Sequence, residues 1–157
     1  MFLYNIFLPE FIKIGLEAED KDEVFEEMVD ILCRTKSSGD REEILKVLWE
    51  RESKMSTGIQ TGIAIPHAKS ATVEHVRGVL GISKKGIEYG ALDGKPVYLL
   101  FMILTPKTDS EEHLRFLKRL SELLSNHEFY TELMAQSDPQ GVNRIIKKYE
   151  DIYVASD

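Results

Sequence analysis

The alternation of polar and apolar positions predicts β-strands at several places along the chain. Residues 11–16 alternate in the manner of a strand or an extended arm. Residues 76–83 form a second candidate, and the segment 84–86 predicts a turn into a short strand at 87–89. Residues 97–104 are apolar without interruption. Such a run is too continuous for a strand with one face in water, so we predict a central strand that is buried on both faces.

Two amphipathic helices are predicted after the first strand, and each is opened by a capping box. Asp20 with Glu23 starts the first helix, and Asp40 with Glu43 starts the second. The stretch Lys36–Gly39 is predicted to end the first helix, because glycine favours helix termination. The apolar positions of the second helix recur at helical spacing, at Ile44, Leu45, Leu48 and Trp49.

Three more helices are predicted in the last third of the chain. One spans about residues 110–125, with Thr108 or Ser110 as its amino-terminal cap. A short helix at about 129–135 follows, and the last helix opens at Asp138-Pro139, since proline is favoured at the first helical position. This order of elements predicts one α/β domain, with a mixed β-sheet flanked by helices on both faces.

The composition is that of an acidic globular domain. A chain of 157 residues fits one domain with a sizeable core, and a formal net charge of −7 argues against non-specific binding to nucleic acid or to anionic membranes. Cys33 is the only cysteine and cannot form an internal disulfide. The apolar start lacks a basic leader, and no apolar run approaches the ~20 residues that span a bilayer. These features predict a soluble, cytoplasmic protein with no nucleic-acid partner and no membrane insertion.

The segment 56–68 combines features that ordinary core packing does not need. Gly58 and Gly62 permit backbone conformations that are closed to other residues, and residues 63–65 predict a short, buried, extended piece. Pro66 then fixes the chain directly before His67. An imidazole on such a stiff support is suited to catalysis, so we interpret this segment as an active loop.

The chain has four histidines, and their surroundings differ. His75 and His127 lie in polar stretches beside a glutamate, which is typical of surface residues. His113 falls in the first turn of the helix predicted at 110–125 and shares a stripe with leucines, so it is expected to point inward. Arg51 lies at the carboxyl end of the second predicted helix, where it serves either the active loop or only the helix terminus.

Together, His67, His113 and Arg51 predict an anion-binding site, and phosphate is the expected ligand. A neutral imidazole nitrogen is a competent nucleophile toward a phosphoryl group, and the phosphoimidazole needs the donors that an arginine fork and a second imidazole supply. The chain has no G-x-S-x-G elbow, Walker loop or HExxH motif, and its glycines do not complete a dinucleotide fingerprint, so no cofactor is expected. A metal site with two histidines stays open as an alternative, although no carboxylate ligand is evident beside His67.

With these residues in hand, the chain resembles the enzyme IIA domains of the fructose/mannitol/nitrogen-regulatory class (type 2) in the bacterial phosphoenolpyruvate phosphotransferase system. The resemblance is collinear over most of the chain. Its specific motifs are Arg51-Glu52, Ser56-Thr57-Gly58, Gly62-Ile63-Ala64-Ile65-Pro66-His67, Ala91-Leu92-Asp93-Gly94 with Pro96-Val97, and Glu112-His113-Leu114.

The resemblance implies a single enzyme IIA domain over residues 1–157, with a core at about 5–150 and a mixed sheet covered by helices. It implies a phosphocarrier in which His67 accepts a phosphoryl group from phospho-HPr, while Arg51 and His113 stabilise that group. The residues that would support the phosphate and the loop are Ser56, Thr57, Gly58, Gly62 and Pro66.

The resemblance is compatible with more than one physiological role. Leu16-Glu17-Ala18, followed by a Lys/Glu-rich helix, is most similar to the stand-alone nitrogen-regulatory branch, which favours a regulatory phosphocarrier. In that branch the donor would be the counterpart of HPr, and the partners would be regulatory target proteins. The alternative is a subunit that passes phosphate to the IIB component of a fructose- or mannitol-type permease. A binding module that acts without phosphorylation is a third hypothesis.

Overall fold

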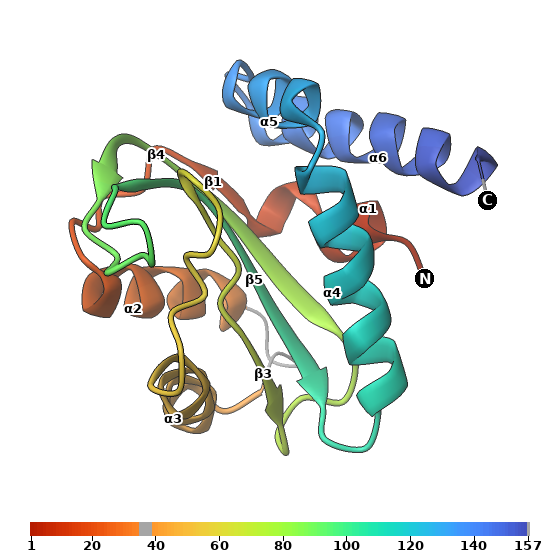
Figure 1. Ribbon diagram of the computed structural model, residues 1–157. Helices are drawn as coiled ribbons and strands as arrows, with labels where there is room; N and C mark the ends of the chain where they lie inside the picture. The colour runs from red at the N-terminus through yellow and green to blue at the C-terminus, as the bar shows by residue number, and fades with distance from the viewer. Residues whose placement is uncertain (35–38, 157) are drawn as a thin grey trace.

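A computed structural model describes residues 1–34 and 39–156 of the chain, and in this part five strands form one mixed sheet. Figure 1 shows this sheet running through the middle of the molecule, with helices on either side. The strands are β1 (Ile12–Ile14), β2 (Ile63–Ala64), β3 (His67–Ser70), β4 (Arg77–Ile87) and β5 (Val97–Pro106).

Strand β5 is the centre of the sheet. It pairs antiparallel with β4 on one side and parallel with both β2 and β3 on the other, while β1 pairs parallel with the far edge of β4. Residues 99–105 of β5 are all buried. The prediction of a central strand buried on both faces at 97–104 is therefore confirmed, with only Tyr98 half-buried.

Helices cover both faces of this sheet, as predicted. Alternate side chains of β5 enter two separate cores: Leu100 and Met102 pack with one set of helices, Leu99 and Phe101 with the other. On the first face lie α2 (Lys21–Leu32) and α3 (Arg41–Glu52). On the second face lie α1 (Leu3–Ile6), α4 (Ser110–Leu124), α5 (His127–Met134) and α6 (Pro139–Ala155). A 3₁₀ turn, η1 (Pro9–Phe11), links α1 to β1.

The predicted helix caps form with local differences. Asp20 and Asp40 accept hydrogen bonds from the amides of Glu23 and Glu43, each at 2.9 Å, and so open α2 and α3 as expected. Neither box has the return bond to its cap residue: the carboxylate of Glu23 accepts from the amide of Glu19 at 3.0 Å, and the carboxylate of Glu43 bonds Ser70 and Thr72. This side chain therefore ties the start of α3 to the end of β3, close to the predicted active segment.

Two of the predicted helix boundaries change. Helix α2 ends at Leu32, ahead of the predicted stop, whose residues 36–38 lie outside the described part of the chain. Helix α4 is capped by Asp109, whose side chain accepts from the amide of Glu112 at 3.2 Å, and not by Thr108 or Ser110. An aspartate whose side chain reaches three residues ahead satisfies the free amides of the first turn.

The predicted turn at 84–86 is wrong. Strand β4 continues through these residues to Ile87, with a shift of register between Ile82 and Ile87. The shift is what a β-bulge produces, and polar residues in a bulge have the same composition as a turn. The separate short strand expected at 87–89 is replaced by the end of β4 and an isolated bridge at Glu88.

The amino-terminal helix α1 was not predicted, and it packs beside α6. Glu150 of α6 is fully buried and accepts from the backbone amides of Leu3, at 2.8 Å, and Tyr4, at 3.2 Å. Arg119 pairs with the same carboxylate at 3.1 Å. Across the described residues, no helix has the length and apolar character needed to cross a bilayer.

Candidate active site

His67 is the first residue of β3, on a strand and not on a free loop. Strands β2 and β3 pair with β5 in one continuous register, in which Ala64 faces Leu100 and His67 faces Ile103. The ladder is interrupted at Pro66, which has no amide hydrogen to donate, although its carbonyl still accepts from Ile103 at 3.0 Å. The sheet thus holds the backbone on both sides of the break, which explains the stiffness predicted for this position.

The imidazole of His67 has a defined tautomer. Its Nδ1 lies 2.7 Å from the carbonyl oxygen of Ile65. Because a carbonyl only accepts, Nδ1 carries the hydrogen and Nε2 carries the lone pair. Burial lowers the pKa of His67, and the nearby charge of Arg51 lowers it further, against the effect of the bond to Ile65. The lowered pKa favours the neutral ring at pH 7, in which Nε2 carries the lone pair.

His113 lies beside His67. The two ring centroids are 5.5 Å apart, and the ring planes are inclined by 49°. His113 is 6% exposed in the first turn of α4, which confirms that it points inward. Its Nδ1 is 2.5 Å from the hydroxyl of Thr105, a buried residue of β5 that sequence reasoning missed. Burial, followed by the charges of His67, Lys69 and Arg51, lowers the pKa of His113 to about 4.

His67 and His113 line one cleft, and Arg51 lines it as well. The structure therefore brings the three predicted residues together. The cleft has a volume of about 460 Å³. Nη1 of Arg51 donates to the carbonyl of Met55 at 3.0 Å, which places the guanidinium at the turn between α3 and the active segment. Three lysines line the cleft as well, at positions Lys54, Lys69 and Lys107, against one acidic residue, Glu50. In a chain with a net charge of −7, this concentration of cations favours an anionic ligand.

The segment before His67 is anchored by a buried carboxylate, Glu52. It accepts from the amide of Thr57 at 2.7 Å, from the hydroxyl of Thr57 at 2.6 Å and from the hydroxyl of Tyr89 at 3.0 Å. Lys21 pairs with it at 3.4 Å. Burial and the charge of Glu52 raise the pKa of Tyr89, so this phenol stays a donor. The roles of Glu52 and Tyr89 were not predicted, because the sequence gives no sign that these distant residues meet.

The other predicted support residues take local roles. The hydroxyl of Ser56 accepts from the amide of Gly58 at 3.1 Å. A Cβ at Gly58 would lie 2.8 Å from that of Ala91, so only glycine allows this close approach. Gly62 has a φ of 78°, and its carbonyl accepts from the amides of Tyr98 and Leu99 in β5. All of these contacts fix the course of the chain. None of the five predicted support residues is among those that line the cleft of His67: Ser56, Thr57, Gly58, Gly62 and Pro66.

The comparisons with known proteins agree with this geometry. The family model described as "Phosphoenolpyruvate-dependent sugar phosphotransferase system, EIIA 2" matches residues 5–149. The chain belongs to this type-2 enzyme IIA family. The resemblance seen in the motifs is thereby confirmed, and the chain is a component of the phosphotransferase system.

Relatives of this enzyme IIA come from both functional branches. The chain is 38% identical over 139 residues to a fructose-specific EIIABC component of Bacillus subtilis. This match covers 88% of the chain but only 22% of that longer protein. It is 34% identical to a fructose-specific EIIA component of Haloferax volcanii, over 87% of this chain and 89% of that protein. The crystal structure of the nitrogen regulatory protein IIA-Ntr from Neisseria meningitidis superposes with a TM-score of 0.85 at 31% identity, covering 92% of this chain and 98% of that one.

The other two histidines of this enzyme IIA lie away from the cleft. His75 is exposed, and His127 stands at the start of α5 with its ring stacked on Tyr130. Among the described residues, no group of three or more His, Cys, Asp or Glu side chains is placed to hold a metal ion. His67 and His113 pair with a carbonyl and a hydroxyl, and neither has a carboxylate bonded to its ring.

The Tyr89→Phe variant of this enzyme IIA is expected to lose about 1 to 2 kcal/mol of unfolding free energy, because one charge-assisted bond to Glu52 disappears. Urea unfolding measures this loss. The matched control is Tyr98→Phe, since the Tyr98 hydroxyl has no hydrogen-bond partner among the described residues. Equal stability losses in the two variants would show that the bond between Tyr89 and Glu52 contributes nothing.

Acid is expected to destabilise this enzyme IIA through His113. The pKa of this residue is about 4 in the folded protein and near its ordinary value of about 6.5 in the unfolded chain. Between these values the unfolded state binds more protons, so the unfolding free energy falls as pH decreases from 7 toward 4. Urea unfolding of His113→Gln should show a shallower decrease over the same interval. Parallel pH profiles for the two proteins would contradict the assignment.

Proposed function

We propose that this enzyme IIA is a phosphocarrier that accepts a phosphoryl group on Nε2 of His67 from a phosphohistidine of HPr, or of its nitrogen-branch counterpart, and acts mainly in regulation. The observation that supports this proposal most directly is the bond between Nδ1 of His67 and the Ile65 carbonyl. It leaves the lone pair on Nε2 of a neutral imidazole, within a cationic cleft.

The transfer balances without a cofactor. The Nε2 lone pair of His67 forms the new N–P bond as the N–P bond of the donor breaks, and the donor imidazole leaves as a neutral ring when its other nitrogen carries a proton. His67 keeps its own proton on Nδ1, where the Ile65 carbonyl holds it. A ring that stays protonated remains a good leaving group, so the phosphoryl group can be passed on.

The surrounding residues supply the charge that the phosphoryl group needs. The group carries about two negative charges. Arg51 offers a planar guanidinium with donors beyond the one used on Met55, and Lys54, Lys69 and Lys107 surround the cleft. If the Thr105 hydroxyl donates to Nδ1 of His113, then Nε2 of His113 carries a hydrogen that can point at a phosphoryl oxygen. As a neutral donor, His113 adds a hydrogen bond to the phosphoryl group and does not compete for the proton on Nδ1 of His67.

The proposal is tested by incubating the protein with phosphoenolpyruvate, enzyme I and HPr. The expected product carries one phosphoryl group that is labile in acid and stable in alkali, and NMR of the imidazole nitrogens should place it on Nε2 of His67. A stable phosphoester, a label on another residue or no label would contradict it.

The alternative function is to pass phosphate to the IIB component of a fructose- or mannitol-type permease. The two fructose-specific relatives favour this role, whereas the similarity to IIA-Ntr favours regulation. Mixing the phosphorylated protein with a purified fructose-type IIB domain distinguishes them. Rapid loss of the label to IIB supports the permease role, and retention of the label supports the regulatory role.

The Arg51→Lys variant is expected to slow transfer by about tenfold to a hundredfold, with little change in stability. Lysine keeps the charge but loses the planar fork that can bond both Met55 and a phosphoryl oxygen. Single-turnover phosphorylation and urea unfolding together check this. The matched control is Lys46→Arg, a cation exchange on the same helix at a largely exposed side chain. Equal rates for Arg51→Lys and the wild type would mean that Arg51 is only a helix-end cation.

A further inference from the structure

A second cavity lies at the opposite end of α4 from the His67 cleft. It has a volume of about 520 Å³ and is bounded by β2, the start of β5, the end of α4 and α5. His113 and Leu117 of α4 line the first cleft, while Leu124 and Ser125 line the second, and the two cavities share no lining residue. A cavity of this size is within the range of small-molecule sites.

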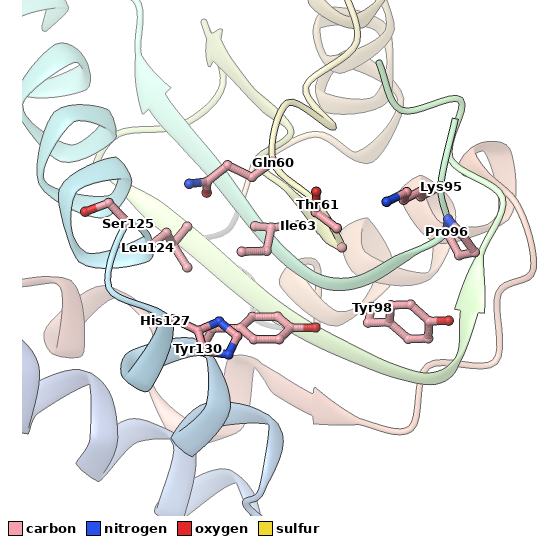
Figure 2. A pocket seen from close by; sticks show the side chains of 11 residues that line it. Gln60, Thr61, Ile63, Lys95, Pro96, Tyr98, Leu124, Ser125, His127 and Tyr130 are labelled. Atoms are coloured by element: carbon pink, nitrogen blue, oxygen red, sulfur yellow. The ribbon is translucent and has the colours of Figure 1, made fainter. Parts of the chain in front are cut away.

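Aromatic side chains form its walls. Tyr130 and His127 of α5 have ring centroids 6.1 Å apart and planes inclined by 27°. Figure 2 shows the rings of Tyr98 and Tyr130 in one row below Ile63, with the hydroxyl of Tyr130 directed toward Tyr98. A Cβ on Gly62 would lie 3.3 Å from the Tyr130 hydroxyl and 3.7 Å from the ring of Tyr98, so the glycine leaves this space open.

Four polar side chains of the cavity are available to a ligand. Among the described residues, the side chains of Gln60, Lys95, Tyr98 and Tyr130 make no hydrogen bond or ion pair with other parts of the protein. Figure 2 shows these four side chains around the same space. They offer an amide, an ammonium and two phenols, which are donors that recognise oxygen-rich ligands.

The charge of the cavity selects an anion. Lys95 is the single formally charged residue of its lining, and the neighbouring Asp93, whose carboxylate accepts from the Lys95 backbone amide at 2.9 Å, is not among the lining residues. This is unusual in a chain with 27 acidic and 20 basic residues. An anionic group that enters next to Lys95 meets no like charge from the lining, and the aromatic faces then favour a ring on the same molecule.

We propose that this cavity binds a small organic phosphate that carries a ring, with the ring against Tyr98 and Tyr130 and the phosphate at Lys95. The ring is either a flat base, as in a nucleoside monophosphate, or a sugar ring, as in a hexose phosphate, because both present a face to a tyrosine and hydroxyls to Gln60. The site goes beyond the phosphocarrier function and does not require a phosphorylatable His67.

An NMR titration of the isotope-labelled full chain tests the site with adenosine monophosphate, glucose 6-phosphate and inorganic phosphate. We expect saturable shifts at the amides of residues 60–63 and 125–130 with at least one of the two organic phosphates, and the responding compound identifies the ring. The His67→Gln variant should give the same shifts. No saturable shift with either organic phosphate, or equal shifts with inorganic phosphate alone, would overturn the proposal.

Variants of the wall then separate the ring from the phosphate contact. Tyr130→Ala should weaken binding by about tenfold, the typical value of one stacked ring, while Tyr130→Phe retains most of the affinity. Lys95→Gln should weaken binding severalfold, and Lys84→Gln, an exposed lysine of β4 outside the cavity, serves as the matched charge control. Unchanged affinity in both Tyr130→Ala and Lys95→Gln would also overturn the proposal, since these substitutions remove its two defining contacts.

Discussion

The His67→Gln variant is expected to lose phosphorylation by phospho-HPr completely. Glutamine preserves much of the volume of the imidazole, and its amide can still donate to the Ile65 carbonyl, which His67 bonds at 2.7 Å. It has no nucleophilic nitrogen lone pair, however, so no N–P bond can form. Quantifying the acid-labile label after incubation with the complete donor system measures this effect.

The matched control is His75→Gln, which makes the same chemical change at an exposed histidine of the same chain. It should be labelled at the wild-type rate and extent. Acid-labile label that persists in His67→Gln would move the acceptor to another histidine, and His113 would be the first to examine because its ring centroid is 5.5 Å from that of His67.

The His113→Ala variant is expected to accept phosphate about 10² to 10³ times more slowly than the wild type, the usual cost of removing one preorganised donor. In our proposal, Thr105 orients the ring so that Nε2–H of His113 faces the phosphoryl group as its charge shifts. The loss should appear in the maximal single-turnover rate at saturating donor, and less in the donor concentration that gives half of that rate.

Folding has to be monitored in this variant, because alanine leaves the buried hydroxyl of Thr105 without its partner. Thr105→Val keeps the His113 imidazole but removes the group that fixes its tautomer. This second variant should therefore lie between the wild type and His113→Ala in rate. A wild-type rate in both variants, with intact folding, would exclude His113 from phosphoryl transfer.

Much of the local structure can be predicted from the sequence because the relevant signals are short-range. Asp20 and Asp40 mark helix starts through bonds that reach only three residues ahead, and the apolar run at 97–104 reports burial directly. The prediction of a turn at 84–86 is wrong because the signals in the sequence are short-range. Polar and glycine residues suit both a turn and a bulge, and only pairing with the distant β5 selects the bulge.

The residues of the candidate site also differ in whether the sequence predicts them, depending on how far away their partners lie along the chain. The rigid backbone position of His67 could be predicted because the constraint on it, Pro66, is its neighbour. Glu52 could not be assigned its role, because two of its partners, Tyr89 and Lys21, lie more than 30 residues away on either side. Thr105 escaped notice inside an apolar strand, where a single hydroxyl gives no sign that it faces an imidazole of the following helix.

Within the proposed phosphocarrier function, the rigid position of His67 has a consequence for how partners recognise the protein. Its backbone is locked into the ladder with β5, and its ring is secured by a carbonyl only two residues earlier. Adding a phosphoryl group at Nε2 leaves both of these attachments in place. The loaded and unloaded proteins should then have nearly superimposable main chains and differ chiefly by about two units of negative charge at one spot. A protein that senses which form is present must detect this local electric field, because the polypeptide gives it little change of shape to recognise.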